Sequence, residues 1–135
     1  MTKTIFTYQG ELRTVCRHES GVELVTDAPK DNQGKGESFS PTDLVAVALA
    51  SCMLTLMGIA ARKLGIDLKG MTAEAEKEMA AHPSRRIGKL VVRIRCPLAL
   101  SPEQRAKLEQ AALTCPVHAS LHPDIKQEID FVWGL

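Results

Sequence analysis

Aromatic side chains are scarce in this sequence, at 4% of 135 residues, although hydrophobic residues together make up 44%. Aliphatic residues and methionine must therefore fill the core. The stacked aromatic platform that holds the bases of single-stranded nucleic acid is lacking. The chain also lacks an excess of charge of either sign, since its formal net charge is +1. This balance indicates neither a nucleic-acid partner nor a membrane surface.

The four cysteines, Cys16, Cys52, Cys96 and Cys115, are widely and irregularly spaced, and no C-x-x-C pair occurs. This spacing disfavours a zinc ribbon and a thioredoxin-type motif, so we expect no metal and no cofactor. The sequence begins MTKTIFTYQG, without the apolar stretch of a signal peptide. We therefore expect a cytoplasmic protein without a structural disulfide framework. The thiols are then either buried and inert or reactive.

Turn signals and hydrophobic patterns predict an α+β fold in one domain over residues 1–135, with the element order βββ-α-ββ-α-α-β. The chain length suits a single domain. Strands are expected at residues 3–9, 11–18, 22–26, 71–80, 90–97 and 125–133, and helices at about 41–64, 102–114 and 116–121. Most neighbouring strands are expected to pair antiparallel. The strand at 71–80 is predicted although AEAEKEM has a helix-like composition.

The predicted helix over residues 41–64 is the most distinctive segment. Ser40 fits the N-cap, Pro41 fits the first helical position, and Asp43 can close a capping box. Residues 44–61 are apolar nearly all round, which is typical of a helix buried on most sides. A domain of this size cannot easily enclose such a helix alone. We infer that a partner subunit covers part of it, and we favour this over a membrane span.

Two of the cysteines could carry chemistry. Cys115 precedes a proline at a predicted helix start, where free backbone N–H groups and the helix dipole favour a thiolate. His118 lies three residues on, on the same helix face. The alternative is that Cys115 merely ends the preceding helix. Cys52 lies in the apolar helix, where a buried inert thiol is the plain alternative. Cys16 and Cys96, in predicted strands, are expected to be packing residues.

Two motifs, SPTDLVAVALASCM and, about sixty residues later, TCPVHASL, resemble those of the OsmC/Ohr family, in particular its OsmC-like branch. The resemblance extends from the first strand to the terminal FVWG, and the two cysteine motifs together are its most specific part. It implies a swapped α+β homodimer in which two long central helices pack back to back and antiparallel sheets wrap around them. It also implies a thiol peroxidase for organic hydroperoxides, with hydrogen peroxide as a further candidate substrate.

Carried onto this sequence, the resemblance makes Cys52 the peroxidatic thiol and Cys115 the resolving thiol, in an apolar cleft at the dimer interface. A dithiol reductant, either lipoyl-type or a small thiol, would restore both thiols. The resemblance further implies an arginine that is held by a carboxylate and activates Cys52. We assign Arg13 to this role, with Arg17 and Arg86 as alternatives.

The chain departs from the family pattern at one position. The family's activating glutamate follows the proline, and here that position is Thr42. Asp43 is one residue on, about 100° round the helix, and is taken as its catalytic replacement. Thr42, Met53 and His118 are expected to contact the substrate. The departure motivates two alternatives on the same scaffold, a non-catalytic redox sensor and a carrier of a small apolar ligand. A structural dimer with inert thiols is a third alternative.

Overall fold

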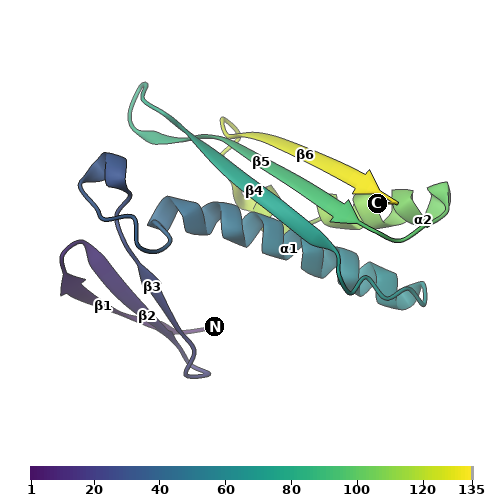
Figure 1. Cartoon of the computed structure of the whole chain (residues 1–135), viewed down its shortest axis with the longest axis horizontal. Helices are drawn as coiled ribbons and strands as arrows, with labels where there is room; N and C mark the ends of the chain where they lie inside the picture. Colours follow the sequence, from purple (N-terminus) through teal and green to yellow (C-terminus); the bar gives the residue numbers. More distant parts are fainter. Residues whose placement is uncertain (135) are drawn as a thin grey trace. The chain divides into compact units, whose positions relative to one another are not determined.

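A computed structural model describes residues 1–134 of the chain (Figure 1). The contacts divide it into two compact units, Met1–Val45 and Ala46–Leu135. The element order, β1-β2-β3-α1-β4-β5-α2-α3-β6 with one short 3-10 turn, is the predicted one, so the α+β fold class is confirmed. The prediction of a single domain over residues 1–135 stays a prediction.

The N-terminal unit is a three-stranded meander. Its strands are β1 (Thr4–Gly10), β2 (Arg13–His18) and β3 (Glu23–Thr26), which pair antiparallel in the order β1-β2-β3. The polar loop that follows contains a single 3-10 turn, Lys30–Asn32. These strands begin and end within two residues of their predicted bounds, because short β-rich runs between turn residues leave little freedom in placing them.

The buried side chains of the N-terminal unit are polar. Among its described residues, the buried ones are Thr26, Asp27 and Ser40, at 5%, 1% and 2% exposure. Many of its large apolar side chains lie at the surface, and the exposed ones include Ile5, Phe6, Tyr8, Val22, Val25 and Phe39. This small sheet therefore buries no large apolar side chain of its own.

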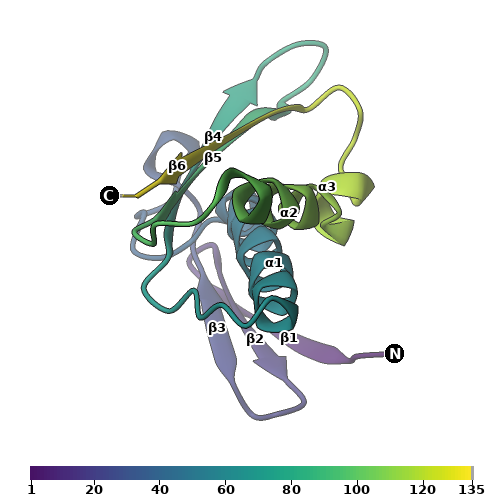
Figure 2. The same cartoon turned by 90° about the vertical axis from the view of Figure 1, so that its right-hand side faces the viewer.

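The C-terminal unit contains a second three-stranded sheet and the helices. Its elements are α1 (Pro41–Lys63, whose first turn belongs to the N-terminal unit), β4 (Thr72–Ala80), β5 (Arg86–Cys96), α2 (Pro102–Leu113), α3 (Pro116–Ser120) and β6 (Lys126–Trp133). The strand order is β4-β5-β6. All three helices lie on the same face of this sheet (Figures 1 and 2). The helix-like composition of β4 is overridden by its pairing with β5 along the whole strand.

One strand pairing is parallel. The predicted antiparallel arrangement is confirmed for β1–β2, β2–β3 and β4–β5. It is wrong for β5–β6, which run parallel from Lys89 opposite Lys126 to Cys96 opposite Trp133. The reason is the connection: α2 and α3 return the chain to the start of the sheet before β6 begins, as a parallel crossover requires.

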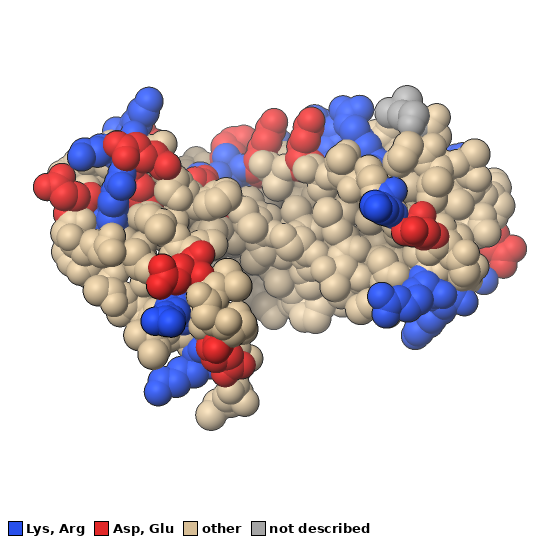
Figure 3. All heavy atoms as spheres, turned by 60° about the horizontal axis from the view of Figure 1, so that its bottom comes forward, with Lys and Arg blue, Asp and Glu red and all other residues tan. Residues whose placement is uncertain are grey.

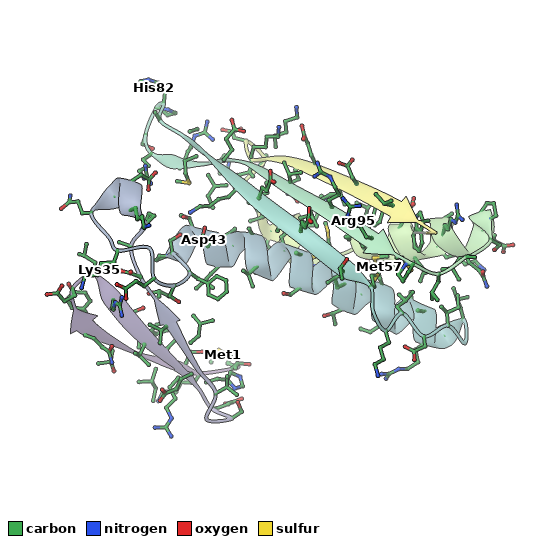
Figure 4. The ribbon with its side chains drawn as sticks, viewed as in Figure 1. Met1, Lys35, Asp43, Met57, His82 and Arg95 are labelled. Atoms are coloured by element: carbon green, nitrogen blue, oxygen red, sulfur yellow. The ribbon has the colours of Figure 1, made fainter. Side chains whose placement is uncertain are left out.

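The core lies between α1, α2 and the sheet. Residues spaced four apart on α1 face inward, which is one face of a helix, and Figure 4 shows Met57 on the side of α1 towards the sheet. On β5 the buried residues alternate as predicted, with Val92, Ile94 and Cys96 at 1% exposure or less. The fully buried side chains that complete this core include Leu49, Met53, Met57, Leu90 and Leu108. Truncating one of them, such as Leu90→Ala, is expected to cost about 2–5 kcal/mol.

The opposite face of α1 is exposed. Val47 and Ile59 are 38% and 50% exposed, and the small residues Ala48, Ser51 and Thr55 between them are also exposed. Figure 3 shows few charged side chains over the middle of this surface. An 18-residue stretch of α1 has a mean hydropathy of 2.3 and is only 33% buried, so the helix is long and apolar enough to cross a membrane. Length and hydropathy alone are weak evidence, since the core helix of a soluble protein meets the same criteria.

Candidate functional site: a pair of thiols

The C-terminal unit brings together two cysteines that lie far apart in the sequence. Cys52 is on α1 and half-buried, and Cys115 is fully buried immediately before α3. Both are free thiols. The Cys52 side chain lies near enough to Cys115 to help raise the pKa of Cys115. The fold thus brings the two cysteines of the predicted pair close together.

The local structure of Cys115 is partly as predicted. It is the N-cap of α3, and its Sγ accepts a hydrogen bond from the backbone N–H of His118 at 3.4 Å. The prediction that this position favours a thiolate is wrong. Burial raises the pKa of Cys115, the Cys52 thiol raises it further, and the N–H groups of Val117 and His118 oppose them only in part. Burial disfavours the charged form, and a five-residue helix offers only a short dipole against it.

His118 is held by a residue on the adjacent strand β6. The ring Nδ1 of His118 contacts Oε1 of Gln127, and Nε2 of Gln127 donates to the backbone carbonyl of His118 at 3.2 Å. Both residues are half-buried. Sequence reasoning identified His118 but missed Gln127, because one polar residue in a strand carries no signal of its own. The expected contact of His118 with a substrate stays a prediction.

Arg13, the arginine assigned from the resemblance, is held by two carboxylates within the N-terminal unit. Its Nη2 pairs with Oε2 of Glu37 and lies 3.6 Å from Oδ2 of Asp27. The same Asp27 oxygen accepts the backbone N–H of Glu37 at 3.0 Å. That backbone hydrogen bond, with Arg13, lowers the pKa of Asp27 despite its burial, and Glu37 in turn raises the pKa of Arg13. Sequence reasoning missed both acids, since only the fold brings them to β2.

The alternative arginines have different surroundings. Arg17 is exposed at the end of β2, and it lines a shallow surface groove beside Lys3 and Glu19. Arg86 is half-buried, and its Nη1 donates to the backbone carbonyl of Ile87 at 3.5 Å. Among the ion pairs described within each unit for residues 1–134, none joins Arg17 or Arg86 to a carboxylate.

The start of α1 is a reciprocal capping box, as predicted. Asp43 lies in the first turn of α1 (Figure 4). Its backbone N–H donates to Oγ of Ser40 at 3.1 Å, and the N–H of Ser40 donates to the Asp43 carboxylate at 2.8 Å. The Thr42 hydroxyl lies 3.2 Å from Oγ of Ser40. Met53 is fully buried in the core. Catalysis by Asp43 and substrate contacts of Thr42 and Met53 stay predictions.

The two remaining cysteines lie in strands, as expected, and the three remaining histidines lie at the surface. Cys96 is buried in β5, and Cys16 is half-buried in β2. His18, His82 and His122 are exposed. Within residues 1–134 no cluster of three or more His, Cys, Asp and Glu could hold a metal ion.

Two grooves open on the C-terminal unit. One of about 550 Å³ lies at the end of α1, and its lining includes Gly58, Arg62 and Met71. The other, of about 350 Å³, lies between α1 and α2, and its lining includes Leu56, Lys107 and Thr114. Ile59 lines both, and neither lining includes Cys52 or Cys115. The apolar cleft expected at the thiols therefore stays a prediction.

Comparison with known families and solved structures identifies the family of this chain. The OsmC-like protein family matches residues 34–130, so the chain belongs to the OsmC/Ohr family. A crystal structure from Psychrobacter arcticus, of a candidate osmotic stress induced and detoxification response protein, is 52% identical. It superposes with a TM-score of 0.92 over 97% of this chain and 96% of that one.

More distant structures share the fold. An organic hydroperoxide resistance protein OsmC from Legionella pneumophila is 17% identical, with a TM-score of 0.78 over 98% of this chain and 96% of that chain. The organic hydroperoxide resistance protein of Bacillus subtilis is also 17% identical, with a TM-score of 0.71 over 97% of each chain. No curated protein matches the sequence significantly.

Proposed function

We propose that this protein is a thiol peroxidase that reduces organic hydroperoxides with Cys52 and Cys115. The observation that carries the proposal is the proximity of these two free thiols in the fold, one half-buried and one buried. Membership of a family that includes organic hydroperoxide resistance proteins supports it. Hydrogen peroxide remains a second candidate substrate.

The two thiols have different surroundings, which suggests different roles. Cys52 is half-buried, so it is the more accessible of the two residues to a peroxide from solvent. Cys115 is fully buried and its pKa is raised, so it is a protonated thiol at neutral pH. Since the thiolate is the attacking species, Cys115 is the poorer first nucleophile. Cys52 therefore attacks the peroxide, and Cys115 attacks second.

The reaction proceeds in two balanced steps. The Cys52 thiolate attacks one peroxide oxygen, the O–O bond breaks, and the alkoxide leaves as an alcohol after it takes up a proton. Cys52 is then a sulfenic acid. The Cys115 sulfur attacks it, a disulfide forms, and the hydroxyl leaves as water with the proton from Cys115. A dithiol reductant, lipoyl-type or a small thiol, reduces the disulfide and is itself oxidised.

Thiolate formation at Cys52 calls for a cation, and we assign Arg13. Its support is the pair of carboxylates, Asp27 and Glu37, that fix the guanidinium direction. A buried carboxylate with a lowered pKa stays charged and keeps its arginine in place. Asp27 and Glu37 would then replace the glutamate whose position is Thr42.

The proposed assembly is a cytoplasmic homodimer. The exposed face of α1, with Val47, Ile59 and small residues between them, suits close packing against a second α1. Exposed apolar residues on the N-terminal sheet, such as Phe6 and Tyr8, also require a cover. A partner subunit accounts for both surfaces, whereas a membrane would account only for the helix. Exchange of the N-terminal sheet between subunits is part of the proposal.

The experiment is steady-state peroxide consumption with dihydrolipoate, using cumene hydroperoxide as the probe. The proposal expects turnover that disappears in Cys52→Ser. In Cys115→Ser a sulfenate should form once and then become over-oxidised. A wild-type protein that forms the disulfide without turnover would instead identify the redox sensor. Thr42, in place of the glutamate, motivates that second candidate.

A further inference from the structure

We propose that Gln127 is a positioning residue for the resolving thiol: its side-chain amide clamps His118 and thereby holds the Cys115 turn against Cys52. The role in resolution rests on the proposed function, whereas the clamp itself is a statement about the position of Cys115. Gln127 touches neither sulfur in the contacts described and acts through His118.

The turn that carries Cys115 is too short to hold its own position. α3 has five residues, well below the length at which an isolated helix is stable in water. Cys115 is its N-cap, and its sulfur accepts the backbone N–H of His118. The position of the sulfur therefore follows the position of His118, and that depends on contacts from outside α3.

Gln127 provides such contacts from a rigid element. It is the second residue of β6 and lies opposite Leu90 in the parallel ladder. Leu90 is a fully buried residue of the central strand β5. Both polar atoms of the Gln127 side-chain amide contact His118. Oε1 contacts the His118 ring, and Nε2 contacts the His118 backbone carbonyl. The clamp thus ties the Cys115 turn to the sheet.

The clamp also fixes the tautomer of His118. The backbone carbonyl of His118 can only accept, so the group of Gln127 that faces it at 3.2 Å is the NH₂ group. The carbonyl oxygen of the Gln127 amide therefore faces Nδ1, and the ring donates there. A neutral His118 ring is then protonated at Nδ1 and carries its lone pair at Nε2.

Position matters because the second step is intramolecular. The Cys115 sulfur displaces the hydroxyl of the Cys52 sulfenic acid, and its rate depends on how often the sulfur lies in attack geometry. If the turn is loosened, the sulfenic acid persists. A second equivalent of hydroperoxide then oxidises it to a sulfinic acid, which thiols do not reduce. The clamp would protect the enzyme from inactivation.

The test uses a pair of substitutions and a neighbouring control. Gln127→Leu removes both contacts at similar size, and Gln127→Glu keeps the acceptor for the ring but loses the donor to the carbonyl. Lys126→Ala changes an exposed neighbour on the same strand. The first measurement is the effective concentration of the Cys52–Cys115 disulfide against a glutathione redox buffer, which needs no peroxide. We expect a fall of about tenfold in Gln127→Leu, a smaller fall in Gln127→Glu, and no change in Lys126→Ala.

The second measurement is the ¹⁵N spectrum of the His118 ring. It should report the Nδ1–H tautomer in the wild-type protein and in Gln127→Glu, and loss of that preference in Gln127→Leu. A purely structural defect elsewhere would not move this signal. If the disulfide and the tautomer are unchanged in both Gln127 variants, the clamp is overturned. If Gln127→Leu does not fold, Gln127→Glu alone decides, through the intermediate fall in effective concentration.

The peroxide experiment separates this inference from the proposed function. With excess cumene hydroperoxide, Gln127→Leu should accumulate sulfinic Cys52 faster than the wild-type protein does, at an unchanged rate of the first oxidation. If the wild-type protein does not react with peroxide, the proposed function fails. The clamp still stands or falls on the glutathione equilibrium and the ring spectrum.

Discussion

The two units of the chain differ in what they bury. Of the residues that the structure describes, every buried hydrophobic one lies between Ala46 and Cys115, in the C-terminal unit. The buried residues of the N-terminal unit, Thr26, Asp27 and Ser40, are polar, and two of them serve an ion pair and a helix cap. The C-terminal unit thus has an apolar core and both candidate redox thiols, and the N-terminal unit has a charge cluster without such a core.

This difference indicates that the two units contribute different parts of the candidate site. Cys52 and Cys115 both lie in the C-terminal unit. Arg13 is held by Asp27 and Glu37, which like it belong to the N-terminal unit. A small sheet without a core depends on burial against something else, so the proposed partner subunit should matter most to the N-terminal unit. Substitutions in the two units should therefore impair the protein in different ways.

The largest expected effect is loss of the attacking sulfur in the C-terminal unit. We expect Cys52→Ser to lower peroxide turnover by at least about a thousandfold, since the covalent step is removed. The matched change in the N-terminal unit, Cys16→Ser, should leave kcat/KM within a factor of about two, because that thiol is a packing residue. Equal losses in both variants would contradict the assignment of Cys52.

Disruption of the exposed α1 face should have the second-largest effect. Ala48→Glu places a charge in the proposed helix–helix contact, and burying an unpaired charge should weaken dimerisation about a hundredfold or more. Light scattering after size exclusion measures the mass. Ala106→Glu makes the same change on the exposed side of α2 and should remain dimeric. A dimer unaffected by Ala48→Glu would place the interface elsewhere.

Removing the proposed activating cation should have an intermediate effect. Arg13→Met should slow both peroxide reduction and alkylation of Cys52 about 10- to 100-fold, because a neighbouring cation favours the thiolate. Arg17→Met, at the exposed end of the same strand, serves as the control and should stay near the wild-type rate. The arginine assignment fails if these two variants exchange their behaviour.

The raised pKa of Cys115 predicts a modest dependence of stability on pH. The pKa of Cys115 in the folded state lies above the unfolded value of about 8.5. The contribution of this thiol to the free energy of unfolding is therefore complete below about pH 8.5 and is lost as the pH rises through the folded-state pKa. Denaturant unfolding of the reduced protein from pH 7 to 10 measures the slope. Cys115→Ala should flatten it by up to about 1.4 kcal/mol per pH unit. An identical slope in both proteins would contradict the buried, protonated thiol.

The smallest effect is expected at Asp43. Asp43→Asn keeps an acceptor for the backbone N–H of Ser40 and removes the charge, so stability should fall by about 1 kcal/mol or less. Turnover should stay within about threefold, since Asp27 and Glu37 already hold Arg13. A loss as large as that of Arg13→Met would instead make Asp43 the catalytic replacement for the glutamate.

Much of the fold could be predicted from local patterns. Pro41 and the capping box set the start of α1, and the alternation of Val92, Ile94 and Cys96 set the inner face of β5. The parallel pairing of β5 with β6 could not, because strand direction depends on the path of the chain between the two strands. The sequence of α1 is apolar on nearly all sides, which predicted that one chain could not bury the whole helix. In the structure, one face of α1 is indeed exposed.

Less of the candidate site was predictable. The two cysteine motifs pointed to a pair, and the fold brings the two thiols together. The N-cap position of Cys115 was predictable, but the direction of its pKa shift was not, since burial arises from tertiary packing. Asp27, Glu37 and Gln127 were missed for the same reason, because their partners lie in other elements of the fold.

The most direct measurement is to mix the fully reduced protein with about one equivalent of cumene hydroperoxide and to map its four cysteines by mass spectrometry. A rapid disulfide between Cys52 and Cys115, absent in Cys52→Ser, is the predicted result. Four unmodified thiols after that treatment, or a disulfide that includes Cys16 or Cys96, would contradict the proposed chemistry.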